Sequence, residues 1–229
     1  MNKLTKNSYV VATIKDWHIE QYSTYSKTIN GQWHLITNNA RLKINELRAI
    51  SPEYIFFPHW SWLVPEEILA EFNCVCFHMT DLPYGRGGTP LQNLISRGHK
   101  TTQVSALKMT RDLDAGPIYL KCPLSLDGSA QEIYERSAQL IAQMITSIIE
   151  LTPSPVEQTG KVTTFERRKP EQSEIQGNED INTLYDLIRM LDAETYPKAF
   201  LHHGNLTLHF ENARLIKDNI NATVTIKRR

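Results

Sequence analysis

The amino-acid sequence predicts an α/β fold, in which a Rossmann-like, doubly wound and mostly parallel sheet carries a small C-terminal α+β appendage. Short apolar runs alternate with helix-type segments before residue 152, which is typical of such a sheet. The length of 229 residues suits one α/β domain of roughly 150 residues with an addition. Because the composition shifts near Thr152-Pro153-Ser154-Pro155, we expect one domain over residues 1–152 and a small second one over 153–229.

The first part of the predicted sheet comes from four apolar runs. Asn39 is suited to capping a helix that runs to about Ile50, and Pro65 opens a short helix over residues 66–72. His78 directly follows the fourth run, and doubly wound sheets bind ligands beyond the carboxyl ends of their strands. The four expected strands are residues 9–14, 33–36, 54–57 and 74–77.

The second part of the chain adds strands at residues 102–109 and 116–120, and three helices. Thr89 and Pro90 favour the start of one helix. Ser129 and Glu132 form a capping box before another, which has a long apolar stripe. In the C-terminal part, a helix from about Asp180 precedes a hairpin that turns at Gly204-Asn205.

Composition limits the possible function classes. Lys plus Arg and Asp plus Glu each number 25, so the formal net charge is zero; a protein that binds nucleic acid through phosphates usually carries a basic surplus. We therefore expect no nucleic-acid partner.

Three cysteines without framework spacing favour a reducing compartment and no metal site. The polar start over residues 1–9 and the absence of a long apolar run predict no signal peptide, no membrane span and a cytoplasmic protein.

Three local features carry possible chemistry. His78 follows a strand, as a general acid or base would, although a strand-end histidine is more often structural. The run Arg86-Gly87-Gly88-Thr89-Pro90 would let backbone amides approach a ligand, or would simply form a tight turn. The run Asp112-Leu113-Asp114-Ala115-Gly116 offers two carboxylates, which also cap turns.

In combination, these segments resemble the folate-dependent formyltransferase family. The family's pattern is Asn-x-His, a Leu-Pro turn, a helix opened by Gly-x-Pro, and a strand leading into Asp-x-Gly. This chain has Cys76-Phe77-His78, Leu82-Pro83, Gly88-Thr89-Pro90 and Asp114-Ala115-Gly116. The resemblance is good over about residues 54–124 and weaker over the rest of the first domain.

The resemblance implies that His78 and Asp114 are catalytic and flank the formyl carbon of 10-formyltetrahydrofolate. His78 would stabilise the developing oxyanion, and Asp114 would set the charge state of His78 and accept the proton of the attacking amine. Cys76 occupies the place of the family's catalytic Asn and is a weak third candidate, because a thiol is a poorer hydrogen-bond donor than an amide. No covalent intermediate on Cys76 is expected.

The resemblance implies where the folate binds, whereas the residues of the acceptor side are candidates on chemistry alone. No metal site is expected. The acceptor side would use Tyr84, Arg86 and Gly87, on the chemistry of a ring face and a phosphate partner. The tryptophans among the folate-side residues are equally suited to core packing. The folate side would use Trp60, Ser61, Trp62 and Leu63, with Thr110, Arg111 and Asp112 from the later loop.

Within the family, three segments look most like the nucleotide-sugar N-formyltransferases: residues 57–62, 77–88 and 167–171. We therefore expect the acceptor to be a nucleotide-linked 4-amino-4,6-dideoxy sugar used in cell-surface glycan biosynthesis. The best single expectation is UDP-4-amino-4,6-dideoxy-N-acetyl-altrosamine, of the pseudaminic acid pathway. Enzymes of this kind commonly form homodimers, so a homodimer is possible.

Four alternatives remain open: a dTDP-linked amino-sugar enzyme, a methionyl-tRNA formyltransferase, a deformylase that passes the formyl group to water, and a non-catalytic binder of sugar nucleotide or folate. The neutral charge and the small second domain count against tRNA. Cys76 is the residue that keeps the non-catalytic binder open, since a broken catalytic set is what such a protein would show.

Overall fold

A computed structural model describes residues 7–194 and 196–229. The expectation of a polar, signal-free start and the beginning of the predicted first domain fall partly on residues 1–6, outside the described residues. The elements in chain order are β1 (Ser8–Ala12), α1 (Asp16–Thr28), β2 (Gln32–Ile36), the 3₁₀ turn η1 (Asn39–Arg41), α2 (Ile44–Ile50), β3 (Tyr54–Phe57), α3 (Glu66–Glu71), β4 (Cys74–His78), β5 (Tyr84–Gly87), α4 (Pro90–Ile95), β6 (Thr101–Lys108), β7 (Ile118–Ser125), α5 (Ala130–Leu151), β8 (Thr163–Phe165), η2 (Pro170–Ser173), α6 (Ile181–Leu191), β9 (Ala199–His203), β10 (Leu206–Ile216) and β11 (Asn219–Arg228).

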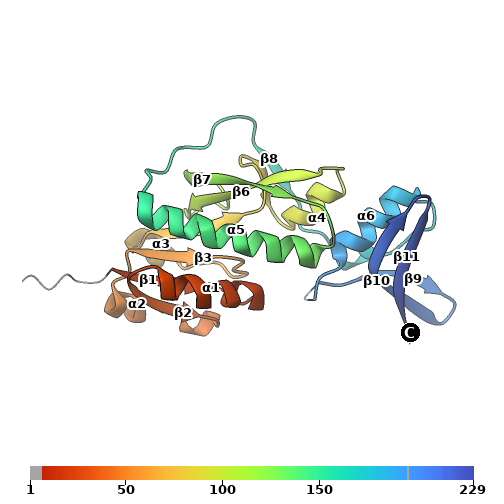
Figure 1. The fold of residues 1–229 in the computed structure, drawn as a ribbon, viewed down its shortest axis with the longest axis horizontal. Helices are drawn as coiled ribbons and strands as arrows, with labels where there is room; N and C mark the ends of the chain where they lie inside the picture. The colour runs from red at the N-terminus through yellow and green to blue at the C-terminus, as the bar shows by residue number, and fades with distance from the viewer. Residues whose placement is uncertain (1–6, 195) are drawn as a thin grey trace, which may run out of the picture. The chain divides into compact units, whose positions relative to one another are not determined.

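The predicted fold class is confirmed. Six strands form one sheet in the order β2-β1-β3-β4-β6-β7, and the first four strands in that order pair in parallel. β1 has β2 on one side and β3 on the other, so the chain crosses over β1 between β2 and β3, which is the doubly wound arrangement. β6 pairs with β4 in the antiparallel direction. Figure 1 shows the helices that accompany these strands.

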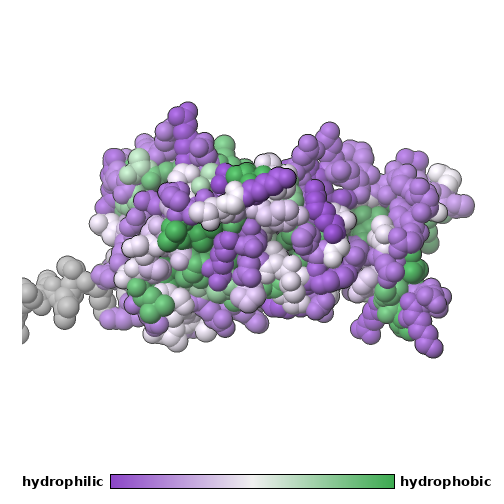
Figure 2. All heavy atoms as spheres, turned by 90° about the horizontal axis from the view of Figure 1, so that it is seen from above, coloured by the Kyte–Doolittle hydropathy of each residue, from purple (hydrophilic) through white to green (hydrophobic). Residues whose placement is uncertain are grey.

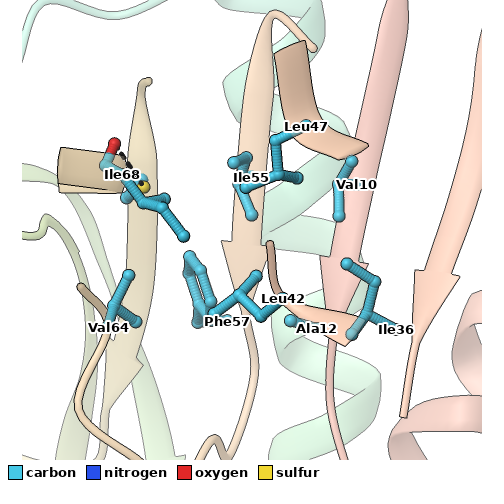
Figure 3. Packing of buried hydrophobic residues seen from close by; sticks show 10 residues of the cluster. Val10, Ala12, Ile36, Leu42, Leu47, Ile55, Phe57, Val64 and Ile68 are labelled. Atoms are coloured by element: carbon cyan, nitrogen blue, oxygen red, sulfur yellow. Dashed lines mark hydrogen bonds between the residues drawn. The ribbon is translucent and has the colours of Figure 1, made fainter. Parts of the chain in front are cut away.

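The core on one face of this sheet is built from alternate residues of the parallel strands. Val10 and Ala12 of β1 lie there with Ile55 and Phe57 of β3, as the two-residue period of a strand requires. Side chains from α2 and α3 cover this face, including Leu47 (Figure 3). The remaining buried members of the cluster are Ile36, Leu42, Val64, Ile68 and Cys74.

Two of the expected helix starts differ in the structure. Asn38, one residue before the expected cap, accepts a hydrogen bond from the Ala40 backbone N–H at 2.9 Å and opens the 3₁₀ turn η1, with α2 following as a separate helix. Thr89 precedes α4 with a φ of 46° and without a capping side-chain bond. The capping box before α5 is confirmed: the Ser129 backbone N–H donates to the Glu132 carboxylate at 2.7 Å, and the Glu132 N–H donates to the Ser129 hydroxyl at 3.3 Å.

The chain forms two compact units that do not follow a single cut in the sequence. One contains the described residues up to Arg86, with Gln103–Pro123 and Glu135–Thr163. The other contains Gly87–Thr102, Leu124–Tyr134 and the described part of Thr164–Arg229. The division of function between residues 1–152 and 153–229 stays a prediction.

In the second unit, α6 packs on the sheet β11-β10-β9. Asp180 caps α6 by accepting from the backbone N–H groups of Asn182 and Thr183 at 2.9 and 3.1 Å. The expected hairpin is present, with Leu206 opposite His203 across the turn. Leu208 lies opposite Ile226 of β11, so one face of this sheet is apolar, and hydrophobic atoms are visible on this part of the chain in Figure 2.

Candidate active site

His78 lies at the carboxyl end of β4, and its ring is held by the segment that follows. The residue is buried, and its Nε2 atom is 2.8 Å from the carbonyl oxygen of Gly85. A carbonyl oxygen only accepts, so Nε2 carries the proton and donates it there. The Thr80 hydroxyl donates to the same oxygen at 3.3 Å. In the neutral ring, Nδ1 is therefore the unprotonated nitrogen, and it is the one left for chemistry.

Asp114 faces this free nitrogen from the loop between β6 and β7. Its Oδ2 atom is 3.6 Å from His78 Nδ1, and the two side chains are 11% and 10% exposed. Asp114 has a φ of 53°, a left-handed conformation that Asp tolerates better than most residues. The structure thus brings together the two residues predicted to be catalytic, with the Asp114 carboxylate facing His78 Nδ1 at a distance slightly longer than a hydrogen bond.

The Asp114 loop is closed at its far end by Gly116. A Cβ atom on this glycine would lie 1.8 Å from the carbonyl oxygen of Lys108, so only glycine allows the two backbones to approach. The Lys108 backbone N–H donates to the Pro117 carbonyl oxygen at 2.8 Å. This close approach fixes the end of the loop that carries Asp114.

A residue that sequence reasoning missed, Gln158, also holds this loop. Its Nε2 atom donates to the carbonyl oxygens of Asp114 and Gly116, each at 2.8 Å. Its Oε1 atom accepts from Nε and Nη2 of Arg86, at 3.1 and 2.7 Å. Gln158 belongs to the irregular segment after α5, where neither periodicity nor a motif singles it out.

Cys76 lies on β4, between Phe57 of β3 and Leu107 of β6 in the sheet register. Burial raises the pKa of its thiol, and the negative charge of Asp114 raises this pKa further. The thiol is therefore protonated near neutral pH. This agrees with the prediction that Cys76 is no nucleophile, and it leaves a weak donor where the family pattern has an amide.

The residues predicted for the folate side lie in two segments. Trp60 packs against the same core cluster as Met109, and its indole Nε1 is buried without a hydrogen-bond partner among the described residues. Trp62 is 43% and Leu63 89% exposed, and the rings of Trp60 and Trp62 are 4.9 Å apart. The exposed faces of Trp62 and Leu63 offer apolar surface to a flat heterocycle, whereas the half-buried Trp60 packs on the core.

In the second of these segments, the Thr110 hydroxyl donates to the Asp112 carbonyl oxygen at 3.1 Å. Ser61 and Arg111 are exposed. The assignment of all seven residues to folate stays a prediction. Among the described residues, no group of three His, Cys, Asp or Glu side chains is placed to hold a metal ion.

The residues predicted for the acceptor side have structural partners. The Arg86 guanidinium is bound to Gln158. A Cβ atom on Gly87 would lie 2.5 Å from the Phe165 carbonyl oxygen, and one on Gly88 would lie 2.8 Å from Arg167 Cα. These glycines therefore let the chain around residues 165–167 pack closely, and Gly88 N–H donates to Phe165 O at 3.0 Å. Tyr84 is half-buried on β5.

Two family models match the chain. The model described as formyl transferase matches residues 27–149, and the model described as the C-terminal domain of methionyl-tRNA formyltransferase matches residues 170–227.

In the part of the chain that the structure describes, no helix is long and apolar enough to cross a membrane.

Among solved structures, the chain is similar to a methionyl-tRNA formyltransferase from Clostridium thermocellum, with 45% identity and a TM-score of 0.95 over 97% of this chain and 100% of that one. Among curated proteins, it is 29% identical to the methionyl-tRNA formyltransferase of Thermodesulfovibrio yellowstonii over 67% of its own residues and 51% of that protein. The chain thus spans about half the length of this curated relative.

More distant structures share the fold alone. HypX from Aquifex aeolicus, solved in complex with tetrahydrofolic acid, is 14% identical with a TM-score of 0.75 over 90% of this chain and 37% of that one. Enzymes titled as sugar or 4-N formyltransferases have 12% to 14% identity and TM-scores of 0.69 to 0.70.

These comparisons correct the sequence interpretation. The expected function on a nucleotide-linked amino sugar is wrong, because the 45% identical structure and the C-terminal family model both carry the methionyl-tRNA description. The expected partners, an amino sugar and no nucleic acid, are overturned by the same matches. The net charge of zero, on which the exclusion of nucleic acid rested, averages an acidic stretch over residues 171–194 with a basic chain end. The assignment of Tyr84, Arg86 and Gly87 to the acceptor side stays a prediction.

Proposed function

The chain belongs to the formyl transferase family, and from this premise we propose that it moves the formyl group of 10-formyltetrahydrofolate to the α-amino group of methionyl-tRNA. The observation that carries the proposal is the 45% identity to the Clostridium thermocellum methionyl-tRNA formyltransferase over 97% of this chain. The family uses 10-formyltetrahydrofolate. The cytoplasmic location and the homodimer stay predictions.

The reaction breaks the bond between the formyl carbon and N10 of the folate and forms one to the amine, which loses the proton that N10 gains. His78 has committed Nε2–H to Gly85, so its Nδ1 side serves the reacting groups. Asp114 Oδ2 lies 3.6 Å from this nitrogen, so a carboxylate faces the reacting side of the ring. A protonated Nδ1 would stabilise negative charge that develops on the formyl oxygen, and the pair would carry the amine's proton toward N10.

Recognition of tRNA is proposed for the second unit, through phosphate contacts. The matched C-terminal family model covers α6 and most of the sheet β9–β11. Acidic side chains concentrate over residues 171–194, while the end of the chain is basic, so the zero net charge hides a local surplus. The exposed basic residues of this region are Arg214, Lys217, Lys227, Arg228 and Arg229.

The proposal is tested by incubating the purified protein with 10-formyltetrahydrofolate and each of three acceptors: methionyl-tRNA, free methionine and uncharged tRNA. We expect N-formylmethionine, detected by mass spectrometry after deacylation, only with methionyl-tRNA. Binding of uncharged tRNA should weaken steeply with salt, as counterion release requires. Equal formylation of free methionine would contradict a tRNA substrate, and no formamide with any acceptor would contradict a transferase.

A further inference from the structure

The segment that follows α5 returns to the candidate site. Ile118 and Val156 form an antiparallel bridge, in which Ile118 N–H donates to Val156 O at 2.7 Å and Val156 N–H to Ile118 O at 2.9 Å. This bridge ties the segment to the start of β7, directly after the Asp114 loop. It delivers Gln158 to the backbone of that loop, although Gln158 and Asp114 are 44 residues apart in the sequence.

Every strong hydrogen-bonding position of the Gln158 amide is used. Two carbonyl oxygens, of Asp114 and Gly116, accept from Nε2, and the Arg86 guanidinium donates twice to Oε1. Exchanging the amide's oxygen and nitrogen would set donor against donor and acceptor against acceptor, so its orientation is fixed. The cationic Arg86 withdraws electrons from the Gln158 amide. This strengthens the hydrogen bonds that the NH₂ group of Gln158 donates to the loop.

The two accepting carbonyls lie on either side of Ala115. Asp114 has a left-handed φ of 53°, which is unfavourable for a residue with a Cβ atom, so rotation of the peptide that follows would let this backbone relax and the side chain move with it. Pinning the Asp114 carbonyl opposes this rotation. Gly85, next to Arg86 in β5, accepts from His78 Nε2. Gly85 therefore holds His78 directly, and the adjacent Arg86 holds Asp114 through Gln158.

We propose that Gln158 is a positioning residue that, with Arg86, holds the Asp114 loop so that the carboxylate faces His78 Nδ1. The role rests on the proposed formyl transfer. Gln158 contacts backbone atoms of the loop, so it acts through Asp114. A misplacement of about 1 Å at a catalytic group costs on the order of a hundredfold in rate, so the loss should appear in kcat.

The test compares two variants of Gln158. Gln158→Met keeps the length and the unbranched shape of the side chain but removes all four hydrogen bonds. Gln158→Glu can still accept from Arg86, but when it is ionised it cannot donate to the loop. Gln143→Met is the matched control, because Gln143 is exposed on α5. For both Gln158 variants we expect kcat to fall about tenfold to a hundredfold, with KM for either substrate within about twofold, and wild-type kinetics for Gln143→Met.

A double-mutant cycle separates positioning from a general structural role. In an Asp114→Asn background, Gln158→Met should reduce kcat by less than about twofold further, because its target is already lost. Full additivity of the two losses, or an unchanged kcat in both Gln158 variants, would overturn the proposal.

The crystal structure of Gln158→Met provides a readout that needs no substrate. The separation of Asp114 Oδ2 from His78 Nδ1 should increase beyond the 3.6 Å of the parent protein, and an unchanged loop would overturn the proposal. If the wild-type protein formylated nothing, the proposed function would fail while this structural result still decided the role of Gln158. If Gln158→Met does not fold, Gln158→Glu serves for both measurements.

Discussion

His78 Nδ1 and Asp114 Oδ2 face each other across 3.6 Å, a separation longer than a hydrogen bond. Since Nε2–H is already donated to the Gly85 carbonyl oxygen at 2.8 Å, His78 cannot present Nε2 to a substrate without losing a buried hydrogen bond. The reactive side of the ring and the position of its charge partner are therefore both fixed before any substrate binds.

The first prediction concerns the imidazole itself. His78→Gln can keep a donor toward Gly85 but lacks an imidazole that can act as an acid or a base, so kcat should fall roughly 10²- to 10⁴-fold. Steady-state formylation kinetics check this, with His203→Gln, an exposed residue of β9, as the control. A kcat within threefold of wild type would remove His78 from the chemistry.

A second prediction concerns Cys76. Burial and the Asp114 charge raise the pKa of the thiol, so it is protonated and unreactive near neutral pH. Cys76→Ala should keep kcat within about fivefold, because only a weak donor is lost. Iodoacetamide at neutral pH should leave Cys76 unmodified in the folded protein, as judged by peptide mass spectrometry. Rapid alkylation, or a loss of more than a hundredfold in the alanine variant, would show that the thiol acts directly.

Gly116 gives a stability prediction. An alanine Cβ would overlap the Lys108 carbonyl oxygen, at 1.8 Å, so Gly116→Ala should destabilise the protein by about 3 kcal/mol or more in urea unfolding. Gly98→Ala is the matched control: Gly98 has a φ of 79° and open space around its Cβ position, so only a backbone cost of about 1–2 kcal/mol is expected. Equal losses would show that the close approach at Gly116 is unimportant.

A pH dependence of stability should come from His18. Burial, and secondarily the charge of His59, lower the pKa of His18 from 6.5 to about 3 in the folded protein. Between these values the unfolded chain binds a proton that the folded protein does not, so the free energy of unfolding falls as the pH drops below about 6.5. The slope from one group is at most about 1.4 kcal/mol per pH unit.

Urea unfolding at pH 5, 6 and 7 measures this dependence. His18→Gln should reduce the slope without abolishing it, because burial also lowers the pKa of His59, to about 4. His203→Gln, which changes an exposed residue, should leave the slope unchanged. If His18→Gln has the same pH dependence as the wild type, the buried ring contributes nothing to acid sensitivity.

Local patterns in the sequence were enough for the sheet class, for most strands of the large sheet and for the pairing of His78 with Asp114, but β5, β8 and β11 were not predicted. Apolar runs marked β1, β3 and β4, and the order of short motifs pointed to His78 and Asp114, which the structure brings together. The adjacent asparagines 38 and 39 are equally good caps by residue type, so only the path of the chain decided for Asn38.

Other features depend on contacts between distant segments. The alternation in β6 fits either strand direction, and its antiparallel pairing with β4 follows from the path of the intervening chain. Gln158 lies in a stretch without regular structure, and its partners are 42 to 72 residues away. The glycines at 87 and 88 have the same sequence signature whether they hold a ligand or a neighbouring backbone, and here they hold a backbone.

The most direct test of the account follows both products of the formyl donor in one reaction. Wild-type protein and His78→Gln are each mixed with methionyl-tRNA and 10-formyltetrahydrofolate carrying an isotopic label in the formyl group. We predict that the wild-type protein places the label on methionyl-tRNA in step with the release of tetrahydrofolate, and that His78→Gln places on the order of a hundredfold less there. Release of the label as formate, with methionyl-tRNA unmodified, would contradict transfer to this acceptor.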